Sequence, residues 1–169
     1  MKRHLFQTIF AIALTFCVFG TSTMAATPNT TTVKSGDGII VSETVEYFSD
    51  GSSCVTTVID ETPITPYATT FSKTGSKVYT LRNKDGDILW QFTVHGTFSV
   101  NSGVSATCTA ASYSINIVDT AWENDSASAS RSSNKAIGNA TFVRKVLFVT
   151  IETKSCTVTL TCDSNGNLS

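Results

Sequence analysis

The sequence has little charge, little proline and almost no histidine, and each shortage limits what the protein can do. Asp, Glu, Lys and Arg make up 15% of the chain, against about 25% in an average soluble domain. A surface that binds a polyanion needs clustered Lys and Arg, and the few in this sequence are scattered. We therefore expect no nucleic acid partner.

Histidine is the scarcest base available for catalysis. The chain has two, His4 and His95, and His4 lies in a segment that we expect to be removed. A Ser–His or Cys–His nucleophile needs a base that a carboxylate orients, and no Ser or Cys here lies in such a motif. One histidine also excludes a multi-histidine metal site. We expect His95 to be an exposed strand residue, and the protein to have no enzymatic activity, cofactor or metal.

The only long apolar run stands at the start of the chain. Two basic residues in "MKRHLF" precede the uncharged "QTIFAIALTFCVFG" and the small residues of "TSTMAA", which is the layout of a secretory signal peptide. The apolar run is shorter than the roughly 20 residues that span a bilayer. We predict cleavage after Ala25, a secreted or cell-surface location and no membrane span. The remaining 144 residues carry ten Lys and Arg against thirteen Asp and Glu, a formal charge of −3.

What the sequence does contain is strand-like alternation. In "ILWQFTVHGTFSV" (88–100) the even positions are apolar and the odd positions mostly polar, as in a strand that covers a core with one face. Thr, which favours strands, is abundant, and Asp-Gly turn signals stand at 50–51 and 85–86. No window shows a helical period. We predict an all-β protein, a β-sandwich of immunoglobulin-like type.

The predicted organisation has five parts: a signal peptide (1–25), a flexible N-terminus (26–38), a β-hairpin (39–60), a Pro-containing linker (61–70) and a β-sandwich domain (71–169). A two-residue turn at Asp50-Gly51 would place Tyr47 opposite Cys54. A change of apolar parity within 104–118 predicts a bulge near 110–112. Periodicity does not settle whether 119–135 is a loop or an edge strand, or whether 136–154 is one bent strand or two.

The stretch "CTVTLTC" puts Cys156 and Cys162 on one face of a strand. Six residues of strand span about 20 Å, whereas a disulfide needs Cα atoms within ~7 Å, so these two cannot bond to each other. Export favours oxidation. Of the five cysteines, Cys17 lies in the predicted signal peptide. The other four allow three connectivities, and of the two that remain we favour Cys108–Cys162 together with Cys54–Cys156.

Three stretches resemble a group of small secreted proteins of Gram-positive bacteria: "GSKVYTLRNKDGDILWQFTVHGTFSVNSGVSATCTAASYSI", "NKAIGNATFVRKVL" and "TVTLTCDSNGNLS". The resemblance covers residues 70–169, with a looser match at Tyr47–Gly51. No activity is assigned to that group, so it implies no catalytic residue. Its recurrent cysteine pair matches Cys108 and Cys162, which supports that bridge; Cys54 and Cys156 look like additions.

Together these patterns predict a secreted or cell-surface, non-enzymatic interaction protein with a protein or cell-wall glycan partner. We also expect self-association through the 39–60 hairpin, which could add to a sheet edge of its own chain or of a second copy. One alternative is an exported antagonist or toxin-like factor that uses the apolar Leu147 and Phe148 as its contact. Another is a carbohydrate-binding module with Trp122 as an exposed aromatic contact.

Overall fold

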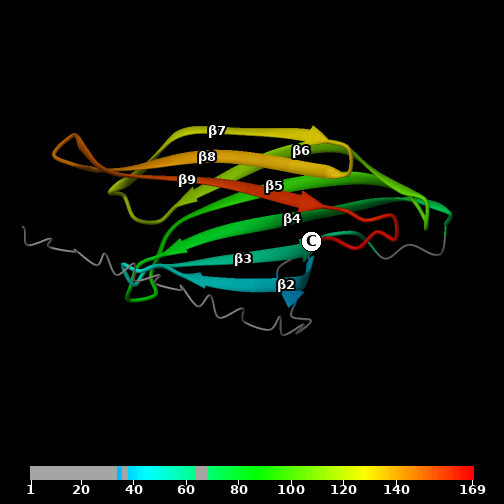
Figure 1. The fold of residues 1–169 in the computed structure, drawn as a ribbon, viewed down its shortest axis with the longest axis horizontal. Helices are drawn as coiled ribbons and strands as arrows, with labels where there is room; N and C mark the ends of the chain where they lie inside the picture. The colour runs from blue at the N-terminus through cyan, green and yellow to red at the C-terminus, as the bar shows by residue number, and fades with distance from the viewer. Residues whose placement is uncertain (1–33, 36–37, 64–67) are drawn as a thin grey trace, which may run out of the picture.

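The fold consists of two antiparallel β-sheets (Figure 1), seen in a computed structural model that describes residues 34–35, 38–63 and 68–169. The predicted signal peptide, most of the predicted flexible N-terminus and the centre of the linker lie outside the described residues. The larger sheet contains β1 (Lys34–Ser35), β2 (Gly38–Tyr47), β3 (Ser53–Asp60), β4 (Thr70–Arg82), β5 (Ile88–Asn101) and β6 (Ser105–Ile117). The smaller sheet contains β7 (Trp122–Ser132), β8 (Lys135–Val146) and β9 (Val149–Thr161).

Both sheets are meanders, because each strand pairs with its neighbour in the sequence. The three-stranded sheet packs on the inner face of β4, β5 and β6, and the chain changes sheet between β6 and β7. The prediction of an all-β fold with two antiparallel sheets is confirmed. Immunoglobulin domains reach neighbouring strands through Greek-key connections, so the sequential order of the described strands does not agree with the finer expectation of an immunoglobulin-like arrangement.

The hairpin of β2 and β3 belongs to the larger sheet instead of forming a separate unit. β3 pairs with β4 from Ser53–Arg82 to Asp60–Gly75, and the Glu61 N–H donates to the Thr74 carbonyl at 3.0 Å. Pro63 interrupts the strand pattern locally, but the chain returns antiparallel beyond it. Because β3 pairs with β4, self-association through the hairpin would have to use the other edge of β2, where β1 pairs at Gly38 and Ile39. It stays a prediction.

The turn between β2 and β3 is one residue longer than predicted. Tyr47 lies opposite Ser53, and Glu46 lies opposite Cys54. The Phe48 N–H donates to the Ser52 carbonyl at 2.9 Å, and Gly51 takes a φ of 84°, which suits glycine. The prediction that Tyr47 lies opposite Cys54 is wrong, because the extra turn residue shifts the pairing of β2 with β3 by one position.

The core lies between β5 and the smaller sheet. The even positions 90–100 of β5 are buried as predicted, with Trp90 at 1% exposure and Phe92 at 0%, while Ile88 at the start of the strand is half-buried. The ring of Trp90 stacks on that of Phe142 from β8, with centroids 3.8 Å apart. A Cβ on Gly138 of β8 would lie 2.3 Å from a methyl of Val94, so only glycine allows the sheets to approach this closely.

The remaining sequence expectations concern β6 to β9. In β6, Thr97 pairs with Ala110 but Phe98 pairs with Cys108, so the bulge falls at Thr109, one residue before the predicted range. The polar segment 119–135 contains the edge strand β7, and 136–154 is divided between β8 and β9.

Candidate functional site

The turn that joins β8 to β9 has an unusual backbone. Val146 pairs with Val149, which leaves Leu147 and Phe148 as the two central residues, with φ values of 47° and 70°. A two-residue hairpin loop with positive φ at both positions strongly favours Asn-Gly and similar pairs. Bulky side chains rarely adopt this conformation because of steric strain.

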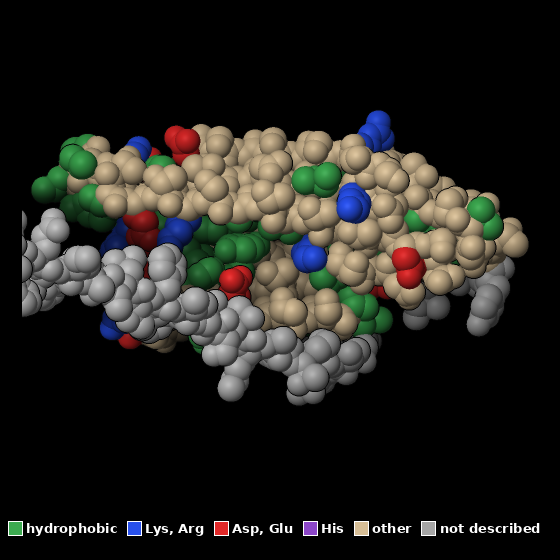
Figure 2. Space-filling model, in the orientation of Figure 1, with side chains coloured by type: hydrophobic (Ala, Val, Ile, Leu, Met, Phe, Trp, Pro, Cys, Tyr) green, Lys and Arg blue, Asp and Glu red, His purple; other side chains and the backbone are tan. Residues whose placement is uncertain are grey.

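The same turn carries a cluster of exposed apolar side chains, which we name the apolar tip. Leu147 is 87% exposed and Phe148 is 98% exposed. Figure 1 shows the turn extending beyond the other described strands at one end of the fold, and Figure 2 shows hydrophobic side chains gathered there. The members of the apolar tip are Val146, Leu147, Phe148, Val149 and Ile151. Leu147 and Phe148 are therefore accessible, and their role as contacts stays a prediction.

The charged residues at the base of the hairpin pair with one another. Lys145 bonds Glu123 of β7 at 2.6 Å. Lys154 lies 3.4 Å from Glu152, 3.7 Å from Asp50 and 5.7 Å from the centre of the Phe48 ring. Arg144 lies 4.0 Å from Glu152, so three cations face three carboxylates and the base has no excess of either sign. The Lys154 contacts hold β9 against the β2–β3 turn.

Trp122, the other predicted contact, is buried. It is 3% exposed and packs edge-on against Trp90, with ring centroids 6.3 Å apart. It borders a cavity of about 220 Å³ beside the base of the hairpin, which Leu81 and Leu89 also line. The prediction of an exposed aromatic surface at Trp122 is wrong. Trp122 is the large apolar side chain of the edge strand β7, and burying it attaches the polar strand to the core.

The four cysteines of the described residues are buried thiols, and no bond joins them. Cys156 and Cys162 share the inner face of β9 and its extension with Val158 and Leu160, as the alternation predicted. Burial raises the pKa of all four thiols, to about 11 for Cys156 and Cys162. Such thiols are protonated at neutral pH and are poor nucleophiles. The predicted disulfides stay predictions.

His95 lies on the outer face of β5, where its Nε2 is 3.1 Å from the Ser114 hydroxyl of β6. Among the hydrogen bonds of the described residues, no carboxylate orients this ring, so the pair lacks the third member of a catalytic triad. In the part of the chain that the structure describes, no three His, Cys, Asp or Glu side chains cluster as metal ligands, and no helix is long and apolar enough to cross a bilayer.

Comparison with known proteins does not assign this chain to a family. No protein-family model, curated protein or solved structure matches it.

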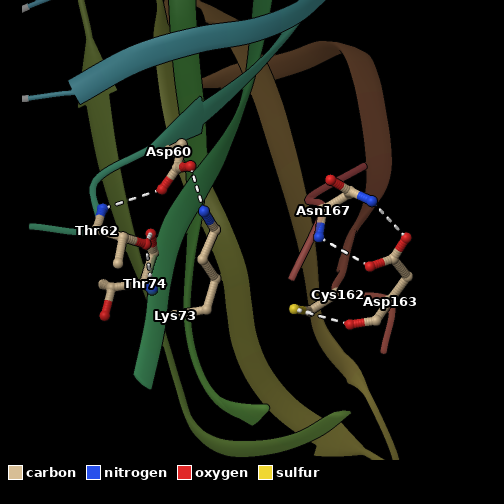
Figure 3. A network of polar contacts seen from close by, with 7 residues as sticks. All are labelled: Asp60, Thr62, Lys73, Thr74, Cys162, Asp163 and Asn167. Atoms are coloured by element: carbon tan, nitrogen blue, oxygen red, sulfur yellow. Dashed lines mark hydrogen bonds and ion pairs between the residues drawn. The ribbon is translucent and has the colours of Figure 1, made fainter. Parts of the chain in front are cut away.

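Two polar networks lie at the ends of β3 and β9, around Asp60 and Asp163 (Figure 3). In one, Asp60 forms an ion pair with Lys73 and accepts the Thr62 N–H at 3.0 Å. Burial raises the pKa of Asp60, but the hydrogen bonds from Lys73 and Thr62 outweigh it, so the net pKa is lowered. In the other, the Asp163 carboxylate accepts both the backbone and the side-chain amide of Asn167 at 2.8 Å. Both networks close turns and strand ends.

Proposed function

We propose that this protein acts outside the cell or at the cell surface as a non-enzymatic interaction protein that binds its partner through the apolar tip. The observation that carries the proposal is the exposure of Leu147 and Phe148 at a turn whose backbone disfavours them. Burying an apolar side chain stabilises a fold by about 25 cal/mol per Å², and Leu147 and Phe148 contribute almost none of this, while their positive φ values add strain. Side chains that strain the backbone without stabilising the fold point to a role other than folding.

The shape of the apolar tip fits a pocket on a partner protein. The tip is a tight turn at the end of two paired strands, with Phe148 at its extremity. Interfaces commonly depend on a few aromatic or aliphatic side chains that enter a desolvated pocket. A strand-paired hairpin presents such a side chain with little loss of conformational entropy on binding.

The charges near the tip favour a protein partner over a lipid surface. Segments that bind membranes at the interface combine apolar side chains with Lys and Arg that attract anionic lipids. Here Lys145 and Lys154 are paired with carboxylates, and the predicted mature chain has a net negative charge. The prediction of a glycan partner depended on an exposed aromatic side chain at Trp122, and Trp122 is buried.

Binding to intact Gram-positive cells, cell-wall fragments and phosphatidylglycerol vesicles tests the proposal. The variants are Leu147→Asp with Phe148→Asp, and Val104→Asp as a matched control, because Val104 is 71% exposed at the β5–β6 turn at the opposite end of the sandwich. We expect saturable, protease-sensitive binding to cells. We expect the double variant to weaken it about tenfold or more and the control to bind like the wild type.

Three outcomes would overturn the proposal: equal binding by the double variant, equal binding to vesicles, or binding to wall fragments stripped of protein. An exported antagonist is one form of the same proposal, with the partner on a competitor cell. Growth inhibition that requires Phe148 would identify this form.

A further inference from the structure

We infer that the four cysteines of the mature chain form two disulfides, Cys108–Cys162 and Cys54–Cys156, and that each ties the six-stranded sheet to the three-stranded sheet. All four side chains are buried, with exposures of 8% or less. Cys108, Cys156 and Cys162 belong to the core between the sheets, and Cys54 lies opposite the core residue Leu81. In a cell the inference rests on the exported location proposed above, because structural disulfides persist in oxidising compartments.

Cys108 and Cys162 meet at the turn between β7 and β8. The Cys108 N–H donates to the Ser133 carbonyl at 2.8 Å, and the Cys162 N–H donates to the Asn134 carbonyl at 3.1 Å. The Asn134 side chain also donates to the Cys162 carbonyl at 2.7 Å. Two consecutive peptide groups thus hold both cysteine backbones, one on β6 and one just beyond β9. Burial is the main cause of the raised pKa of Cys162, and Cys108 is the smallest of its causes.

Cys54 and Cys156 meet beside the aromatic core. Cys54 lies opposite Leu81, which lies opposite Trp90. Cys156 lies opposite Ala140, two residues from the Phe142 that stacks on Trp90. The Tyr79 ring, 5.6 Å from that of Trp90, is near both thiols: burial first, then Cys54 and Cys156, raise the pKa of its hydroxyl.

Strand geometry excludes the other connectivities. Cys54 and Cys108 lie on β3 and β6, and three strand spacings separate these strands by about 14 Å. Cys162 pairs with Leu168, whose side chain lies against Gly75, the residue opposite Asp60 on β3. Asp60 is six residues along β3 from Cys54, a separation of about 20 Å. A disulfide tolerates Cα atoms no more than ~7 Å apart, so Cys54 cannot reach Cys162.

Each bridge requires an external disulfide, such as oxidised glutathione or an exported oxidoreductase. One cysteine thiolate attacks a sulfur of that disulfide and releases a thiol; the second thiolate then attacks the mixed disulfide and releases another thiol. The two electrons and two protons of the cysteines end on the released thiols. The raised pKa values make thiolate scarce once the core has closed, so the bridges form before burial is complete.

Non-reducing peptide mapping tests the inference, using the mature chain refolded from denaturant in a glutathione redox buffer, so that the result is independent of export and of any partner. We expect peptides linked through Cys108–Cys162 and Cys54–Cys156 and a mass lower by four hydrogen atoms. The Cys54→Ala, Cys156→Ala variant should keep the first link. Four alkylatable thiols, or a Cys54–Cys162 link, would overturn the inference. Failure of the binding experiments above would leave this result unchanged.

A second measurement uses the chain refolded without oxidant. Alkylation of Cys156 and Cys162 at pH 8 should be about a hundredfold or more slower than in the denatured chain, because a pKa of about 11 reduces the thiolate fraction by that factor. Equal alkylation rates would show that Cys156 and Cys162 are not buried, and would overturn the inference by contradicting the burial on which it depends.

Discussion

Replacing Leu147-Phe148 by Asn-Gly separates the stability of the β8–β9 turn from its proposed role in binding. Leu147 and Phe148 are 87% and 98% exposed, so their removal takes almost no contacts from the core. Left-handed backbone costs about 1–2 kcal/mol for each ordinary residue. Glycine removes the backbone strain at its position, and asparagine removes part of the strain at the other. Glycine also raises the conformational entropy of the unfolded chain, which lowers the stability by about 0.5–1 kcal/mol.

The net expectation is a gain of about 1–2 kcal/mol in the free energy of unfolding. For a domain of this size that gain corresponds to a rise in Tm of roughly 3–6 °C. Differential scanning calorimetry of the isolated protein measures it, with light scattering to exclude a change in association. The same variant should lose cell binding as the double aspartate variant does.

Opposite effects on stability and on binding are the signature of a side chain retained for a partner. An unchanged or lower Tm would refute the reasoning about strain at φ values of 47° and 70°. A higher Tm with full binding would confirm the strain and refute the role of the apolar tip.

The other predictions concern the core and the polar network. Gly138→Ala should lower stability by about 1–3 kcal/mol, because its Cβ would lie 2.3 Å from Val94; a urea titration that shows no loss would contradict the close approach of the sheets. Leu168→Ala should cost about 2–3 kcal/mol, since Leu168 is 7% exposed, whereas Leu147→Ala should change stability by less than about 0.5 kcal/mol; equal effects would contradict the burial. The lowered pKa of Asp60 contributes stability above its unfolded value of 3.8 that is lost as the pH falls below it, so Asp60→Asn should flatten the acid limb of the stability curve; an unchanged limb would refute this.

Much of the fold follows from period-two alternation. The buried face of β5 and the inner face shared by Cys156 and Cys162 could be predicted from the residue order alone, because a strand exposes alternate residues to opposite sides. The partners of those strands could not. Nothing in the hairpin sequence shows that β3 pairs with β4 across a segment containing Pro63, since cross-strand pairing depends on residues distant in sequence.

The candidate site was only partly visible in the sequence. "VLFV" is apolar on both parities, which periodicity does not resolve, and its two central residues are not turn formers. The run is explained once Leu147 and Phe148 are seen as the turn itself, with Val146 and Val149 paired behind them. Trp122 was misplaced for the opposite reason: its polar neighbours suggested exposure, whereas an edge strand needs one apolar side chain to attach it to the core.

Site-specific photo-crosslinking tests the central claim most directly. A benzophenone-bearing amino acid replaces Phe148 in one protein and Val104 in a second, and each is irradiated on intact Gram-positive cells. The account predicts a discrete protein adduct from position 148 that is absent from position 104. The same adducts from both positions, or adducts from position 148 to lipid or glycan alone, would contradict it.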